Sequence, residues 1–215
     1  MFYLVFIATW AIAVPCLVGV LRYTQIPIQF KPLVYLLWLG LATEVLALIS
    51  VKMFRNNMAV YNSYMLFDFL MMLWLFYRWG AFGRLPKWVL YGAASLYTVV
   101  WIFDNLLLHN VSQMNIIFRM AYSVTLVLLG IDQLSRIYIN NKGYLSRNPY
   151  LYTCLAVIFY YTYSTFVALF ANSSLFGPSP SLWRHTLVVY AMVNGATNIL
   201  YSIALLWMSK KARYT

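Results

Sequence analysis

The sequence predicts an all-α membrane protein with seven transmembrane helices, its N-terminus outside the cytoplasm and its C-terminus inside. Three observations lead to this prediction. Of the 215 residues, 64% are hydrophobic and only 9% are charged, whereas a soluble domain carries about 25% charged residues. The hydrophobic residues form continuous runs long enough to cross a bilayer. The basic residues are concentrated on alternate connections between those runs.

The continuous runs define the spans, because a spanning helix needs about 20 mostly apolar residues. Runs without strict alternation favour helices over the strands of a membrane barrel. Pro15 lies inside the first run and is expected to kink that helix, since proline has no amide hydrogen to donate. The chain is expected to form one domain, 1–215, with spans at Phe2–Leu21, Leu33–Val51, Tyr61–Phe76, Trp88–Leu108, Asn115–Ile131, Tyr150–Phe170 and Thr186–Met208.

The distribution of basic residues predicts the orientation. The first, third and fifth connections and the C-terminal tail hold 11 Lys and Arg residues, while the opposite side holds 3, namely Lys52, Arg55 and Arg184. Cytoplasmic connections are the ones enriched in Lys and Arg, which places the tail in the cytoplasm of a bacterial inner (plasma) membrane. The net charge of +11 is then a topology signal, and no nucleic acid is expected as a partner because the basic residues are scattered singly.

Ionisable side chains within the spans are the most informative for function, since a charge in the lipid core is costly unless it is paired, protonated or hydrated. Asp132 and Arg136 stand four residues apart on a helix, which favours a local ion pair. Arg119 is expected to pair with Asp104 because the fourth and fifth spans form a hairpin. All four acidic residues fall within or at the edge of apolar runs: Glu44, Asp68, Asp104 and Asp132.

Most of these groups fall in the outer half of the predicted bundle, where we expect a polar pocket for a small ligand or cation. The alternative is that the amides only link helices, at about 0.6 kcal/mol per contact. Ser164 and Thr165 are expected to bond to their own helix backbone. The predicted ligand-binding residues are Glu44, Asn62, Asp68, Asp104, Arg119, Asn194 and Asn198.

Several classes of chemistry lack the residues that they require. The seventh span contains no lysine for a retinal Schiff base, and two histidines cannot supply the usual three ligands of a catalytic zinc. No P-loop, His-Glu-x-x-His or Gly-x-Ser-x-Gly motif is present. Cys16 and Cys154 lie in apolar runs without a Cys-x-x-Cys pair. No cofactor, metal site or catalytic residue is therefore predicted.

Two groups of short motifs resemble a known kind of protein. One group is Thr43-Glu44, Asn56-Asn57, Tyr61-Asn62 and Asp68-Phe69, and the other is Tyr160-Tyr161 to Phe166, Asn194, Asn198-Ile199 and Tyr201. Together they resemble small, uncharacterised seven-span bacterial membrane proteins, some of which are associated with neighbouring sensor histidine kinases. Asp68 departs from that pattern, in which glutamate is expected. The resemblance implies no reaction and favours a sensing or accessory role.

The leading hypothesis is a non-enzymatic sensor or accessory subunit that binds a ligand outside and signals through a protein partner. The seven residues after Met208 are too few to hold an output domain. The first alternative is a small transporter or channel for a cation, a proton or a polar solute, ranked second because Asp132 is the only acid predicted near the inner side. The second alternative is an intramembrane enzyme that uses Glu44 and Asp68 in acid–base chemistry.

Overall fold

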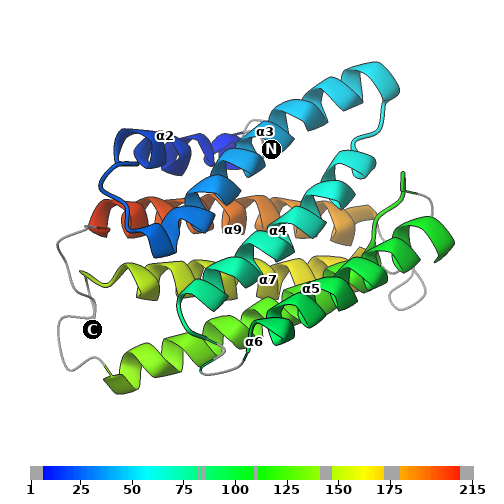
Figure 1. Ribbon diagram of the computed structural model, residues 1–215. Helices are drawn as coiled ribbons and strands as arrows, with labels where there is room; N and C mark the ends of the chain where they lie inside the picture. Colours follow the sequence, from blue (N-terminus) through cyan, green and yellow to red (C-terminus); the bar gives the residue numbers. More distant parts are fainter. Residues whose placement is uncertain are drawn as a thin grey trace.

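The computed structural model describes residues 7–81, 83, 86–108, 111–140, 147–171 and 180–208, with the side chains of 140, 171 and 180–184 left out. Throughout this described part the regular structure is helical. The long helices run beside one another as a bundle (Figure 1). The elements are α2 (Ala13–Leu21), η1 (Ile28–Phe30), α3 (Lys31–Phe54), α4 (Met58–Arg78), α5 (Lys87–Ile102), η2 (Phe103–Leu108), α6 (Ile116–Asn140), α7 (Pro149–Ala171) and α9 (Pro180–Trp207).

Six helices of the described part are long and apolar enough to cross a membrane: Ile28–Phe54, Met58–Arg78, Lys87–Leu108, Ile116–Ile139, Pro149–Phe170 and His185–Trp207. Each overlaps one of six predicted spans, although the fifth predicted span, Asn115–Ile131, ends eight residues too early. The prediction of a helical fold with several helices able to cross a membrane is therefore confirmed. The first predicted span, Phe2–Leu21, corresponds to a shorter apolar segment, Ile7–Leu21, and residues 1–6 lie outside the described part. The count of seven spans and the orientation stay predictions.

The short first segment is interrupted where the sequence predicts a kink. The helix breaks at Ala11 and Ile12, four residues before Pro15. Pro15 has no amide hydrogen to donate to the carbonyl of Ala11. That carbonyl instead accepts a 3.1 Å hydrogen bond from the amide of Val14. The predicted effect of Pro15 is therefore confirmed, and α2 begins after the break.

The two ends of the bundle are named after Asn56 and Arg22, and the site is located relative to them. At the Asn56 end, the side chain of Asn56 donates a 3.0 Å hydrogen bond to the carbonyl oxygen of Ser112, which joins the α3–α4 turn to the α5–α6 connection. At the Arg22 end, the guanidinium of Arg22 donates to the carbonyl oxygens of Leu205 and Leu206 in α9. Helices α3, α5 and α7 run toward the Asn56 end, and α4, α6 and α9 start there.

Aromatic side chains form the core between α4, α6 and α7. The ring centroid of Tyr122 lies 6.3 Å from that of Phe69, 5.2 Å from that of Phe118 and 5.7 Å from that of Tyr161. The contacts of Tyr122 with Phe69 and Tyr161 are edge-to-face, and such contacts stabilise a core beyond the burial of apolar area. These rings fill the middle of the bundle, and Tyr122 also lines the main cavity described below.

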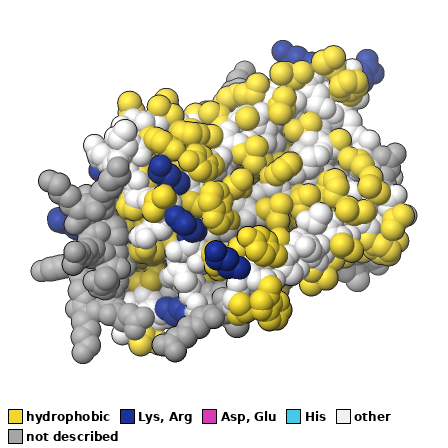
Figure 2. Space-filling view, in the orientation of Figure 1, with side chains coloured by type: hydrophobic (Ala, Val, Ile, Leu, Met, Phe, Trp, Pro, Cys, Tyr) yellow, Lys and Arg dark blue, Asp and Glu magenta, His cyan; other side chains and the backbone are white. Residues whose placement is uncertain are grey.

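The outer surface of the bundle is apolar over much of its area. Helix α5 has no buried residue among those described, and Trp88 is 71% exposed. The C-terminal half of α3 is similar, ending in Phe54 at 72% exposure. Figure 2 shows hydrophobic side chains across most of one face, with Lys and Arg in two groups, on the left and at the upper right. Such a surface suits a lipid solvent, which also explains the low content of charged residues.

Helices α6 and α7 approach closely at Gly130, which leads to a first prediction. A β-carbon at Gly130 would lie 3.0 Å from Cγ1 of Ile158 and 3.7 Å from the carbonyl oxygen of Cys154, whereas one at Gly92 in α5 would meet nothing within 4 Å. Gly130→Val is expected to lower the free energy of unfolding by about 1–3 kcal/mol through overpacking. The matched variant Gly92→Val is expected to leave it unchanged or slightly raised, because valine favours helix over glycine.

Thermal unfolding of both variants in detergent measures the difference. An equal loss of stability in the two variants would contradict the assignment of Gly130 to a tight helix contact.

Candidate ligand pocket

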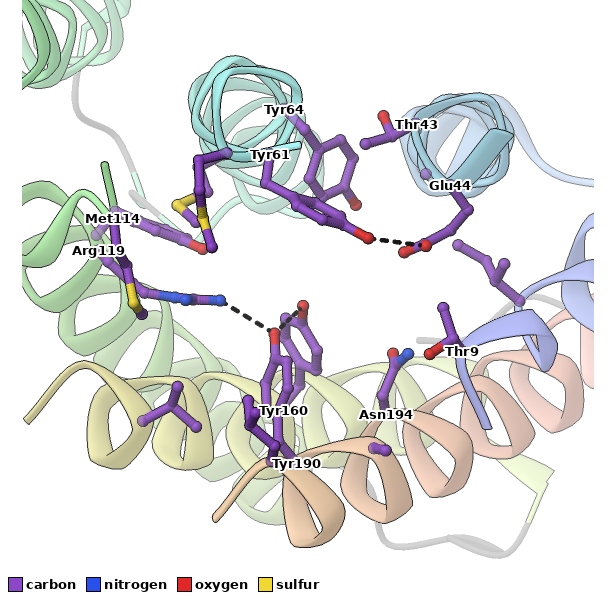
Figure 3. A pocket seen from close by; sticks show the side chains of 18 residues that line it. Thr9, Thr43, Glu44, Tyr61, Tyr64, Met114, Arg119, Tyr160, Tyr190 and Asn194 are labelled. Carbon is purple, nitrogen blue, oxygen red and sulfur yellow. Dashed lines mark hydrogen bonds between the residues drawn. The ribbon is translucent and has the colours of Figure 1, made fainter. Parts of the chain in front are cut away.

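A cavity of about 310 Å³ lies in the half of the bundle nearer the Asn56 end (Figure 3). Small-molecule sites have volumes of about 300–1,000 Å³. The volume of this cavity is about that of ten water molecules in liquid water. Side chains from α3, α4, α6, α7, α9 and the first segment line it. The polar lining residues are Thr9, Thr43, Glu44, Tyr61, Tyr64, Arg119, Tyr122, Tyr160, Tyr190 and Asn194.

Glu44 carries the negative charge of the cavity. It lies on α3, and the next two residues, Val45 and Leu46, are exposed on the outer surface. Its side chain is half-buried, and Oε2 accepts a 3.0 Å hydrogen bond from the hydroxyl of Tyr61 on α4. Within the described part of the chain, no Lys or Arg nitrogen lies within the 4.0 Å that would make an ion pair with Glu44. The carboxylate is therefore held by a neutral donor.

Arg119 carries the positive charge and projects into the cavity from the start of α6 (Figure 3). Its Nε donates to Oγ of Ser164 at 3.1 Å, and Nη2 donates to the hydroxyl of Tyr190 at 3.2 Å. The guanidinium carbon also lies 5.7 Å from the centroid of the Tyr190 ring, within the range of a cation–π contact. All of these partners are neutral, so Arg119 has no ion-pair partner among the described residues.

The predicted ion pair between Arg119 and Asp104 is not formed. Asp104 lies in η2, a π-helical turn at the end of α5, and is fully buried. Its Oδ2 accepts a 2.8 Å hydrogen bond from the amide of Phe118, in the first turn of α6. The first amides of a helix have no partner within the helix and carry a partial positive charge. The backbone of α6, not the side chain of Arg119, therefore engages this carboxylate.

The hydroxyl groups of two neighbouring residues have different roles. Oγ1 of Thr165 donates to the carbonyl oxygen of Tyr161 at 2.9 Å, which confirms the predicted bond to its own helix. The hydroxyl of Ser164 accepts from Arg119 instead, so the same prediction was wrong for Ser164. Asp132 and Arg136 form the predicted ion pair at 2.8 Å, with both side chains close to half exposed.

Tyrosines occupy the space between the two charged groups. The hydroxyls of Tyr160 and Tyr190 lie 2.7 Å apart, so the hydrogen bonds continue from Arg119 across Tyr190 to Tyr160. Figure 3 shows Tyr160 and Tyr190 below the cavity, with Tyr61 and Tyr64 above it. The lining therefore combines aromatic faces with hydroxyl groups that both donate and accept.

A second, smaller cavity of about 50 Å³ lies deeper, toward the Arg22 end. It is lined by Asp68, whose side chain is 2% exposed and whose two oxygens each lie 2.7 Å from the hydroxyl of Tyr161. Asn198 also lines it, and Nδ2 of Asn198 donates to Oδ1 of Asn194 at 3.3 Å. The residues that line both cavities are Ile12, Tyr64, Tyr160 and Asn194.

The structure thus divides the predicted ligand-binding residues into three groups. Glu44, Arg119 and Asn194 line the main cavity, and Asp68 and Asn198 line the smaller one. Asn62 and Asp104 line neither of these cavities.

The amide of Asn62 has a role in joining helices. Its Nδ2 donates to the carbonyl oxygens of Val111 and Gln113 at 2.8 and 2.7 Å. The indole of Trp101 donates to the backbone oxygen of Asn62 at 2.8 Å. These bonds attach α4 to the end of α5 and to the α5–α6 connection.

Sequence reasoning missed three tyrosines of the lining, Tyr122, Tyr160 and Tyr190. The chain has 19 tyrosines, and most of them are equally compatible with a core or an interfacial position. Tyr160 and Tyr161 are adjacent in sequence, yet on a helix they point about 100° apart. Tyr160 consequently reaches the main cavity, while Tyr161 bonds to Asp68 in the smaller one. Their pairing in the motif was a signal, but their separate positions depend on the packing of α7.

No family model matches the chain, and neither a curated protein nor a solved structure is significantly similar to it. The residues that the structure describes contain no group of three or more His, Cys, Asp or Glu side chains that could hold a metal ion. The chemistry of the main cavity therefore comes from one carboxylate, one guanidinium, an amide and a set of tyrosines.

The contact between Asp104 and α6 generates a second prediction. Asp104→Ala removes the acceptor for the amide of Phe118 and is expected to lower the free energy of unfolding by about 0.5–2 kcal/mol, the usual value of a helix N-cap. Asp104→Asn keeps an oxygen acceptor at the same place and is expected to lower the free energy of unfolding by less than Asp104→Ala does. Thermal unfolding in detergent measures both variants. Equal stability of Asp104→Ala and the unchanged protein would contradict the capping role.

Proposed function

We propose that this chain is a sensor or accessory subunit of a bacterial inner membrane that binds a small polar ligand in the main cavity and signals through a protein partner. The observation that supports the proposal is that Glu44 and Arg119 line one cavity of ligand size, each without an ion-pair partner within 4.0 Å in the described part of the chain. Unpaired ionisable groups inside a membrane are costly to keep. A ligand that pairs with them would repay that cost.

The proposed topology has seven spans, with the N-terminus outside and the C-terminus in the cytoplasm. The 11-to-3 distribution of basic residues supports this orientation. It puts the Asn56 end outside and the Arg22 end at the cytoplasmic side. The main cavity then lies in the outer half of the bundle, where a ligand from outside the cell would reach it.

Ligand binding would act on the arrangement of the helices. Glu44 lies on α3 and Arg119 on α6, so an occupant that contacts both side chains would join the α3–α4 hairpin to the α6–α7 pair. The tip of that hairpin stands away from α7 and α9 at the Asn56 end (Figure 1). If the ligand made better contacts when the hairpin and the α6–α7 pair lay closer together, binding would shift the population toward that closer arrangement. A partner packed against the bundle, such as a sensor kinase, would respond to this repacking.

A ligand screen on the purified full chain tests the proposal. A ligand that binds the folded state raises the free energy of unfolding by RT ln(1 + [L]/Kd), about 2.7 kcal/mol at 100 times Kd. Small polar molecules of several charge classes would be added to the protein in mild detergent, with thermal unfolding as the readout. At least one class is expected to raise the unfolding temperature, and Glu44→Gln and Arg119→Gln are expected to abolish that rise.

The exposed ion pair supplies matched controls. Asp132→Asn and Arg136→Gln remove the same charges outside the cavity, at side chains that are 46% and 44% exposed. Both controls are expected to keep the ligand-dependent rise. A rise that persists in Glu44→Gln and Arg119→Gln, or a screen in which no class of small molecule stabilises the protein, would contradict the proposal.

A second candidate function is transport of a cation, a proton or a polar solute. The observation that favours it is the smaller cavity, which shares four lining residues with the main one and continues toward the Arg22 end as far as Asp68. Two sites in series across a bundle are what a permeation path requires.

Flux into liposomes that contain only this protein distinguishes the two candidates. Transport predicts flux that Asp68→Asn reduces at least tenfold, because the carboxylate of the smaller cavity would be lost. Sensing predicts ligand binding without flux. Flux that Asp68→Asn leaves unchanged would contradict a path through the smaller cavity.

A further inference from the structure

We infer that the ligand of the main cavity is a zwitterion, with a carboxylate at one end of a short chain and an ammonium at the other. The inference rests on the proposed function and specifies the ligand of that same site. It follows from the positions of the two charged groups, from what they bond to, and from the chemistry of the residues between them.

The Arg119 side of the cavity fits a carboxylate. A guanidinium has five N–H donors, and the contacts to Ser164 and Tyr190 use one at Nε and one at Nη2. The remaining donors include both hydrogens of Nη1, and Figure 3 shows the guanidinium directed into the cavity. Guanidinium groups bind carboxylates with paired, charge-assisted hydrogen bonds, which are stronger than neutral ones.

The Glu44 side fits an ammonium. Within the described part of the chain the carboxylate accepts one hydrogen bond, from Tyr61 to Oε2, and Oε1 accepts none. Asn194 and the ring of Tyr61 lie on the same side of the cavity as Glu44 (Figure 3). Aromatic faces attract ammonium groups by about 0.5–2 kcal/mol, and the amide oxygen adds an acceptor.

The two charges are kept apart by the fold. Opposite charges inside a membrane protein ordinarily pair with one another, as Asp132 and Arg136 do at 2.8 Å. Glu44 and Arg119 instead stand on opposite sides of the cavity, each bonded to neutral hydroxyls (Figure 3). A simple anion would leave Glu44 without an ion-pair partner, and a simple cation would leave Arg119 without one. A molecule with both charges satisfies both side chains and leaves the site neutral.

The separation also limits the shape of the ligand. An α-amino acid has its ammonium and carboxylate on one carbon, so it cannot contact side chains on opposite sides of the cavity with its charged groups alone. A chain with the two groups at its ends can do so, and 310 Å³ restricts that chain to a short one. The third nearby ionisable residue, Asp68, lies in the smaller cavity, where both of its oxygens contact Tyr161.

A series of simple probes tests this inference on the full chain in detergent. Glycine, 4-aminobutyrate and 6-aminohexanoate vary the distance between the charges, while butylamine and butyrate each carry one charge. At least one of the two longer zwitterions is expected to bind about tenfold or more tightly than glycine, butylamine and butyrate, as judged by calorimetry and by thermal unfolding. Equal affinity for a zwitterion and for either singly charged probe would overturn the inference.

Two variants assign each charge of the probe to its side chain. Glu44→Gln is expected to weaken binding of the preferred zwitterion about 10- to 100-fold, toward the affinity of butyrate, with little effect on butyrate itself. Arg119→Gln is expected to weaken binding of the preferred zwitterion to a similar extent, toward the affinity of butylamine, with little effect on butylamine itself. Arg119→Lys is expected to recover part of the lost affinity. Unfolding without probe shows that each variant is folded, and Asp132→Asn serves as the unaffected control.

The outcomes also separate this inference from the proposed function. If no probe binds, or if Glu44→Gln weakens butyrate as much as the zwitterion, the ligand class is wrong. A ligand of another class that depends on Glu44 or Arg119 in the broader screen would then still support a binding function. If no class of small molecule in that screen stabilised the protein, both the inferred ligand class and the proposed binding function would be contradicted.

Discussion

Water is absent from the core of a bilayer, so a polar group of this chain within the membrane is costly unless it finds a partner in the protein or in a ligand. The structure depends on how that requirement is met. Asn62 donates to two carbonyls of the α5–α6 connection, and Asp104 accepts the amide of Phe118. Hydroxyls such as that of Thr165 bond to the preceding turn of their own helix. These groups hold the helices at their observed positions.

Two charged side chains meet the requirement only in part. Glu44 and Arg119 each bond to neutral hydroxyl groups and both line the main cavity. A neutral donor or acceptor offsets less of the cost of a charge than an opposite charge does. The position of these two side chains is therefore the feature that most directly indicates a ligand, and it explains why the proposed ligand carries both charges.

The same residues would connect the proposed ligand binding to the arrangement of the helices. The strongest packing of the bundle joins α6 to α7 and α7 to α9, while α3 and α4 pack mainly on each other. The main cavity lies between these two parts, so an occupant adds contacts across a boundary where the helices make few of their own. Because such a ligand acts on the packing between two helix groups, a protein partner in the membrane could respond to it without touching the ligand.

The sequence by itself determined the class of the protein, six of its membrane-crossing helices and the break before Pro15. These properties are local, since they follow from the length of apolar runs and from the missing amide of one residue. It also identified the ionisable residues that matter and the pair of Asp132 and Arg136, because residues four apart on a helix are always neighbours.

Only the tertiary structure decided which of those residues meet. Asp104 caps α6 rather than pairing with Arg119, and Ser164 bonds to Arg119 rather than to its own helix. Both outcomes depend on the rotation and offset of neighbouring helices, which an apolar run with few polar residues does not encode in a visible pattern. Tyr122, Tyr160 and Tyr190 were missed for the same reason, because a lipid-facing, a core and a cavity-facing tyrosine have the same appearance in sequence.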